Sequence, residues 1–61
     1  MKASTKYYID YVVIPETNGL ISYYQLTRTK DDAILYSNGD INNVFMECWK
    51  NGIAYNDVVV L

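Results

Sequence analysis

The alternation of apolar and polar side chains predicts a β-hairpin in the first half of the chain. Residues 6–14 are rich in aromatic and β-branched side chains, which favour a pleated strand. Pro15 cannot donate to a strand ladder, so it ends this strand or marks an edge. Asn18-Gly19 is the strongest short hairpin signal in the chain, because both residues tolerate positive φ. Residues 20–28 are then the return strand.

Both faces of this hairpin are expected to be apolar. With Asn18 and Gly19 as the two loop residues, Ile14 would face Tyr23, and cross-strand partners share a face. One face then carries Ile9, Tyr11, Val13, Tyr24 and Leu26. The other carries Tyr8, Val12, Ile14, Ile21 and Tyr23, diluted by Asp10 and Gln25. A single helix covers only one face of such a sheet, so we predict that the second face is an interface.

The clearest helix is predicted from Asp40 to Asn51. Asp40 is a good N-cap, and Gly52 suits the left-handed position that ends a helix. The apolar side chains recur with helical spacing and form one stripe: Ile41, Val44, Phe45, Cys48 and Trp49. We therefore expect Phe45 and Trp49 to pack in the core rather than to form an exposed recognition pair.

The segments on either side of the helix complete the predicted sheet. Residues 29–32 resemble a helix start, and residues 33–36 read equally well as a short strand; we favour a short strand or an extended segment. Residues 53–61 are predicted to return as a strand that is apolar on both faces near its end. The chain, 1–61, is then one small α+β domain: a three- to four-stranded, mainly antiparallel sheet packed on one helix, in the order β-β-(β)-α-β.

The composition contains few of the residue types that enzymes commonly use for catalysis. The chain has no His and one Cys, but seven Tyr. His is the usual proton shuttle near neutral pH, and a metal site normally needs several His, Cys or clustered carboxylates. Cys48 lies on the apolar stripe with no His to activate it, so we expect it to be buried. Asp31-Asp32 could begin an acid–base or metal site, but a solvated turn is the better interpretation. We predict a non-enzymatic protein without cofactor or metal.

A binding function is favoured instead, because Tyr and Trp are enriched where proteins contact one another. We predict contacts through Tyr8, Val12, Ile14 and Tyr23. Met46 falls off the helical stripe and is either a further, adaptable contact or a side chain exposed without a role; we include it among the candidate contacts. A chain of 61 residues is marginal alone, and one Cys cannot close an internal disulfide, so we expect a protein partner or a homodimer.

The charge pattern narrows the partner. A net charge of −2 with scattered basic residues argues against direct nucleic-acid binding, although Tyr rings that stack single-stranded bases are an alternative function. DNA mimicry, in which carboxylates stand where phosphates lie, would use Asp31 and Asp32 among other acids. The N-terminal segment is a poor signal peptide, and the apolar stretch after it is too short to span a membrane. We therefore expect a cytoplasmic protein without membrane contact.

The layout resembles that of small phage-encoded inhibitors of host enzymes, namely the short inhibitors of uracil-DNA glycosylase and small anti-CRISPR proteins. The resemblance is carried by the turn Asn18-Gly19, the return strand with Tyr23-Tyr24, the helix over 40–51 and the closing strand to Leu61. It implies a protein of the host cytoplasm that binds and inhibits a nucleic-acid-processing enzyme, such as a glycosylase or a CRISPR effector. For the glycosylase inhibitors it also implies a dimer that traps an apolar loop side chain of the enzyme and blocks its DNA groove. The alternative is a homo-oligomeric structural module without an inhibitory role.

Overall fold

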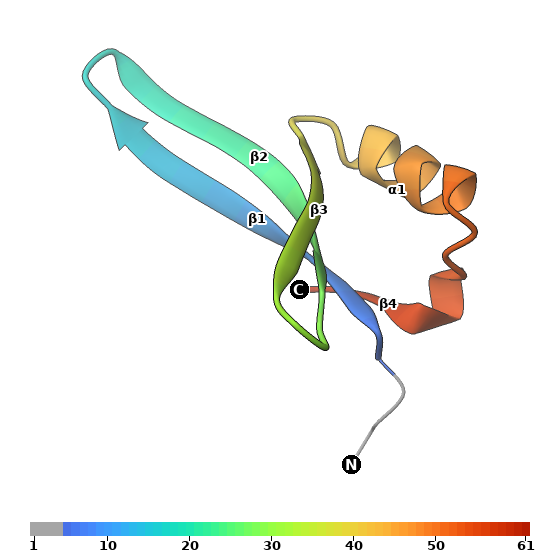
Figure 1. Ribbon diagram of the computed structural model, residues 1–61. Helices are drawn as coiled ribbons and strands as arrows, with labels where there is room; N and C mark the ends of the chain where they lie inside the picture. The colour runs from blue at the N-terminus through green and yellow to red at the C-terminus, as the bar shows by residue number, and fades with distance from the viewer. Residues whose placement is uncertain (1–4) are drawn as a thin grey trace.

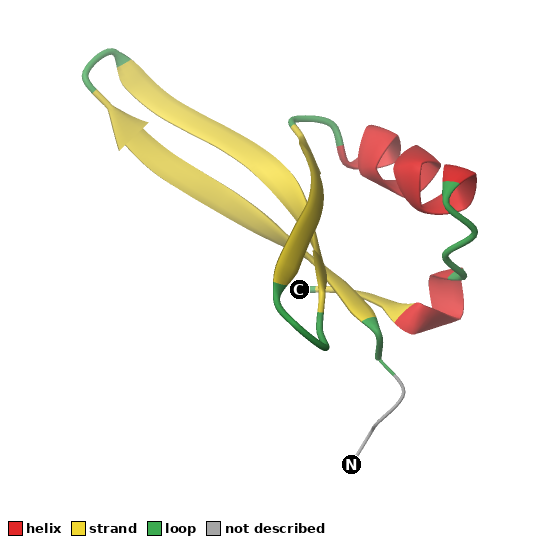
Figure 2. Ribbon diagram, in the orientation of Figure 1, coloured by secondary structure: helices red, strands yellow, loops and turns green. Residues whose placement is uncertain are grey.

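The computed structural model describes residues 5–61; the first four residues, part of the segment considered above as a signal peptide, lie outside this range. The elements are β1 (Tyr7–Glu16), β2 (Gly19–Arg28), β3 (Ala33–Asn38), α1 (Ile41–Lys50), a 3-10 turn η1 (Tyr55–Asp57) and β4 (Val58–Val60). The strands form one sheet in the order β3-β2-β1-β4, with α1 packed on one side (Figures 1 and 2). β1–β2 and β2–β3 are antiparallel and β1–β4 is parallel. The predicted α+β fold is confirmed.

The register of the β1–β2 hairpin differs from the predicted one by two residues. The loop residues are Thr17 and Asn18, and Ile14 pairs with Ile21. Gly19 begins β2 instead of closing the loop, and its φ of 135° is a conformation that glycine adopts without steric cost. A shift of two residues preserves the alternation of side chains, so the two predicted faces keep their members.

The far half of the hairpin projects beyond the rest of the molecule as a two-stranded arm, residues 12–23 (Figure 1). β3 pairs with β2 only as far as Tyr24, and β4 pairs with β1 only as far as Ile9. The arm therefore has no third strand, and it gives the chain its elongated shape of 40 × 26 × 16 Å. Pro15 lies on the free edge of β1, where a missing N–H is tolerated.

The hydrophobic core joins one face of the hairpin base to α1. The fully buried apolar side chains are Ile9, Leu26, Val44 and Cys48. Partly buried side chains pack around them: Tyr7, Tyr24, Tyr36, Ile41, Phe45, Ile53 and Val58. Asp40 caps α1 as predicted, because its carboxylate accepts a 2.9 Å hydrogen bond from the backbone N–H of Asn42. The predicted burial of Cys48 is likewise confirmed.

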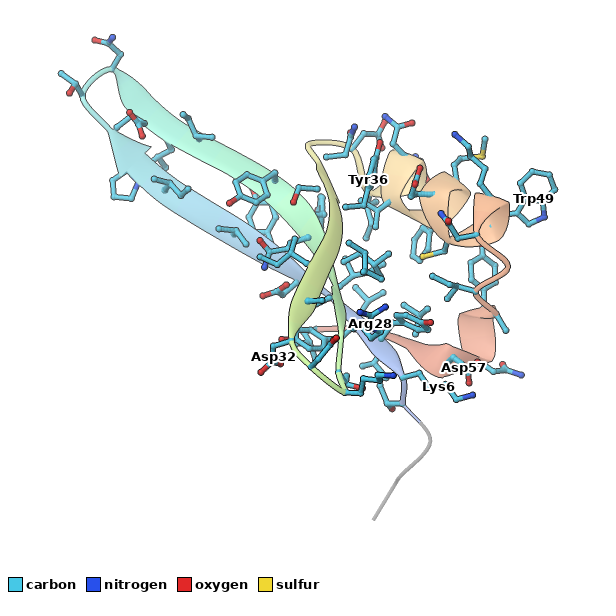
Figure 3. All side chains as sticks on the ribbon, in the orientation of Figure 1. Lys6, Arg28, Asp32, Tyr36, Trp49 and Asp57 are labelled. Carbon is cyan, nitrogen blue, oxygen red and sulfur yellow. The ribbon has the colours of Figure 1, made fainter. Side chains whose placement is uncertain are left out.

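Trp49 does not join this core, which corrects the expectation drawn from the helical stripe. Its side chain is 76% exposed and points away from the sheet (Figure 3). Val44 and Cys48 lie one turn apart and face the sheet, whereas Trp49 is displaced by about 100° around the helix axis from Cys48. A single short helix contacts the sheet along a narrow line, so the edge of the apolar stripe remains in solvent. Phe45, one turn before Trp49 on the same edge of the stripe, lies closer to the sheet side and is half-buried.

For the segments that flank α1, the structure confirms the sequence-based predictions only in part. Residues 33–38 form β3, which confirms the favoured strand, and residues 29–32 form a turn. The closing strand is shorter than predicted, because residues 53–57 do not enter the sheet. The backbone N–H of Asp57 bonds back to the carbonyl of Ala54 at 3.0 Å and closes the 3-10 turn. Asn and Asp are depleted in strands, which explains why Asn56-Asp57 turn instead of extending. β4 then runs parallel to β1, with α1 in the connection that such a pairing requires.

Candidate protein-binding surface

The sheet face opposite α1 is not covered by any element within residues 5–61 (Figure 1). Strand pairing and alternation place twelve side chains on this open face: Tyr8, Asp10, Val12, Ile14, Glu16, Ile21, Tyr23, Gln25, Thr27, Ile34, Ser37 and Val59. The face runs from the base of the sheet out along the arm. It is mostly apolar or aromatic, which is unusual for the solvent side of a two-layer fold.

Four of the predicted contact residues lie on this face. Val12 pairs directly with Tyr23, Ile14 follows Val12 on the same side of β1, and Tyr8 lies nearer the base of the hairpin. Ile14 is exposed, and the other three side chains are half-buried although no element covers them, because neighbouring side chains shield one another. The sequence therefore grouped these four residues on one surface.

Sequence reasoning did not count three further apolar residues among the contacts. Ile21, Ile34 and Val59 extend the open face, and Ile34 is 60% exposed. Ile34 reaches this face through its pairing with Thr27, next to a bulge at Leu26/Thr27, and Val59 through its pairing with Tyr8. The sequence already placed Ile21 on this face, whereas only the register of β3 and β4 places Ile34 and Val59 there, and no short-range pattern specifies those pairings.

The arm is apolar on its other face as well. Val13 and Leu20 lie on the side of the sheet that α1 covers, but beyond the reach of the helix, and Leu20 is 72% exposed. Nearer the base, the rings of Tyr11 and Tyr24 are in contact in a tilted arrangement, with centroids 4.9 Å apart and 46° between their planes. The arm therefore carries exposed apolar side chains on both sides and has no core of its own.

Two polar side chains lie near the base of the open face without the hydrogen bonds that burial demands. Thr27 is 2% exposed, and its Oγ1 has no hydrogen-bond partner within the described chain. Asp10 Oδ1 is also covered and has no partner there. Most buried polar atoms in folded proteins are paired, so two unpaired atoms on one face are an exception that needs a cause. The sequence suggested only that Asp10 dilutes this face.

Met46 belongs to a second apolar patch on the helix side of the molecule. It borders a cavity of about 450 Å³ that is lined mainly by Phe45, Met46, Trp49, Ile53 and Tyr55. The rings of Phe45 and Tyr55 meet edge to face, with centroids 5.5 Å apart and an angle of 84° between their planes. Met46 is exposed, as the sequence suggested, but it lies on α1, on the other side of the sheet from the open face. It therefore does not belong to the same surface as Tyr8, Val12, Ile14 and Tyr23.

Asp31 and Asp32 lie in the turn between β2 and β3 and serve the turn itself. Arg28 donates two hydrogen bonds to the carboxylate of Asp31, at 3.0 Å and 2.8 Å, and the backbone N–H of Ala33 donates a third at 3.2 Å. The hydrogen bonds from Arg28 are the main reason that the pKa of Asp31 falls to about 2. Asp32 adopts a φ of 58°, which Asp tolerates better than most residues. The predicted solvated turn is confirmed.

The remaining candidates for chemistry are the thiol of Cys48 and the acidic side chains. Burial is the largest cause that raises the pKa of the Cys48 thiol, which disfavours the reactive thiolate. Across residues 5–61, the structure groups no three His, Cys, Asp or Glu side chains that could hold a metal ion. None of the helices within that range is long and apolar enough to cross a membrane.

Comparison of the chain with protein-family models, with curated proteins and with solved structures finds no match. The functional argument therefore depends on the geometry of the chain itself.

Proposed function

We propose that this chain is a protein-docking module that acts in the cytoplasm of a host cell by binding and inhibiting a host enzyme. The observation that carries the proposal is the open face: an apolar, aromatic sheet surface that the helix does not cover. Contiguous exposed apolar area is rare on monomeric proteins and marks interaction sites. Tyr8 and Tyr23 supply rigid amphipathic contact area of the kind found at binding hot spots.

The arm strengthens this interpretation. An isolated two-stranded hairpin is marginally stable in water. Here residues 12–23 extend beyond the core with apolar side chains on both faces, including Val13 and Leu20. Contact with a partner through the open face would shield part of the arm from water and stabilise it, which is the role expected of a projecting docking element.

A nucleic-acid-processing enzyme is the target class that the layout suggests, but steric docking explains the structure better than DNA mimicry. DNA mimicry needs carboxylates that form no bonds within the fold and are arranged along the surface like the phosphates of DNA. Asp31 is held by Arg28, Asp40 caps α1, and Glu47 lies 3.9 Å from the ammonium of Lys50. These acids serve the fold, and the open face that we propose for docking is mainly apolar.

A second copy of the chain is the other candidate occupant of the open face. Among residues 5–61, four apolar side chains are fully buried, which is a small core for an independent domain. Pairing the open faces of two identical chains would enlarge the buried apolar area without a second kind of protein. Self-association and binding of a host protein are separated by the experiment below.

The test compares two neighbouring residues on opposite faces of the arm. Ile14→Lys places a charge on the open face, and Val13→Lys places the same charge on the other face; both side chains are exposed, so neither change should prevent folding. Circular dichroism checks that both variants fold. Immobilised wild-type and variant chains are used to capture proteins from a lysate of candidate host cells, and each captured enzyme is then purified and its activity titrated with each chain.

We expect Ile14→Lys to weaken binding and inhibition by at least about tenfold, as for a charge placed in an interface, and Val13→Lys to leave both unchanged. Sedimentation velocity measures self-association of the same three proteins. A dimer that Ile14→Lys dissociates, without any inhibited enzyme, would establish the second candidate. Retention of every partner and of the oligomeric state by Ile14→Lys would refute a docking role for the open face.

A further inference from the structure

We propose that the open face accepts an arginine side chain of its protein partner at Asp10, between Tyr8 and Tyr23. This inference rests on the proposed docking function and names the chemistry of the partner. Four residues define the arginine site: Tyr8, Asp10, Tyr23 and Thr27.

The strand pairing brings these four side chains together. Asp10 pairs with Gln25 on β2, so Thr27 and Tyr23 are its two diagonal neighbours on that strand. Tyr8 is the next residue on the same side of β1 and pairs directly with Thr27. Direct cross-strand partners lie about 5 Å apart and diagonal ones about 7–8 Å, which long and aromatic side chains span. The carboxylate therefore has a tyrosine in reach on two sides.

The charge of Asp10 is not balanced by any side chain within residues 5–61. The ion pairs formed among residues 5–61 join Arg28 to Asp31 and Lys50 to Glu47, and neither includes Asp10. One of its oxygens is covered and lacks a donor, although the side chain as a whole is only half-buried and reaches the surface. A carboxylate that is partly shielded from water and has no cation beside it gains from a cation that arrives with the partner.

Thr27 supplies a second, independent observation at the same place. Its hydroxyl oxygen is buried, has no partner within the described residues, and lies on the same face as Asp10. Both oxygens are covered by neighbouring side chains in the free chain, so a ligand reaches them only by displacing that cover. A ligand that brings more than one N–H can then pair with both. A single apolar side chain would leave both oxygens unpaired.

Arginine meets these requirements better than lysine. Its guanidinium is planar, carries five N–H donors in a fixed fork and is more weakly hydrated than an ammonium, so it is desolvated at lower cost. It also stacks on aromatic rings, and Tyr8 and Tyr23 provide such rings beside the carboxylate. The apolar residues further along the arm, Val12 and Ile14, would then contact the neighbours of that arginine.

The test uses three capped peptides as probes, with the sequences Leu-Arg-Leu, Leu-Lys-Leu and Leu-citrulline-Leu. Citrulline has the shape of arginine without its charge. Each peptide is titrated into the isotopically labelled chain, and amide chemical shifts report where it binds. Asp10→Asn removes the charge at the site, and Asp32→Asn removes the same charge from the β2–β3 turn as a matched control. The dispersion of the spectra shows that each variant is folded.

We expect the arginine peptide to shift the amides of the arginine site saturably and at least about fivefold more tightly than the citrulline peptide. Asp10→Asn should abolish that difference, and Asp32→Asn should preserve it. Equal affinity of the arginine and citrulline peptides on the open face would overturn the arginine proposal while leaving docking intact. Preferential binding of the lysine peptide, or no saturable shift at these residues, would also overturn it. Docking itself is judged separately, by the Ile14→Lys and Val13→Lys pair.

Discussion

Thr27→Val is the substitution that tests most directly whether the hydroxyl on the open face is unpaired. Valine has nearly the shape of threonine, so the change leaves no cavity, and Val is at least as favourable in a strand. Because Thr27 is 2% exposed and its Oγ1 has no partner, the folded state bears the desolvation cost of that hydroxyl. Such a cost is about 1–3 kcal/mol, so the variant should be more stable than the wild type by about 1–2 kcal/mol.

Thr29→Val is the matched control. The hydroxyl of Thr29 lies within hydrogen-bond distance of the carbonyl oxygens of Thr5 and Lys6, at 3.1 Å and 3.0 Å, so removing it should lower stability by about 0.5–1.5 kcal/mol. Urea unfolding followed by circular dichroism measures both changes, and in a domain of this size 1 kcal/mol corresponds to about 4–8 °C in Tm. If Thr27→Val destabilises the chain as Thr29→Val does, the Thr27 hydroxyl is bonded in solution and the argument for the arginine site loses one of its two observations.

Three further predictions test the fold. Because the pKa of Asp31 falls from 3.8 to about 2, its pairing with Arg28 stabilises the folded chain above pH 3.8 and that stabilisation is lost as the pH falls toward 2; Tm measured against pH should lose this acid-dependent step in Arg28→Gln. Leu26→Ala should cost about 2–5 kcal/mol because Leu26 is fully buried, whereas Leu20→Ala should change the free energy of unfolding by no more than about 0.5 kcal/mol. Trp49→Ala should likewise change stability by no more than about 0.5 kcal/mol, and fluorescence quenching by acrylamide should show an accessible indole in the wild type; a loss of 3 kcal/mol or more, at about the level of a core aromatic, would contradict the exposed position.

Local sequence patterns predicted where the strands and the helix lie better than how these elements pair and pack with one another. The faces of the hairpin survived an error of two residues in register, because side chains alternate with a period of two. The helical stripe identified Val44 and Cys48 correctly but could not show how narrow the contact with the sheet is, so it also placed Trp49 in the core. The helical spacing of apolar residues does not show how much of the resulting stripe a neighbouring element covers.

For the candidate site as well, local patterns predicted some features and missed those that depend on three-dimensional neighbours. Alternation along β1 and β2 grouped Tyr8, Val12, Ile14 and Tyr23, which lie on the open face. The unpaired atoms of Asp10 and Thr27 were beyond sequence reasoning, because hydrogen-bond satisfaction depends on three-dimensional neighbours. The parallel pairing of β4 was missed for a related reason, since no short-range signal states which edge a strand will join.

That parallel pairing has a consequence for how the chain acquires its structure. β1 and β4 are separated by nearly the whole chain, so their contact closes a long loop and is expected to form late in folding. Until Val58–Val60 arrives, the backbone edge at Tyr7–Ile9 is an unfilled position in the sheet that a strand from another molecule can occupy. Slow delivery of the final strand, whether during translation or after dilution from denaturant, would therefore favour intermolecular strand exchange and aggregation over completion of the monomer.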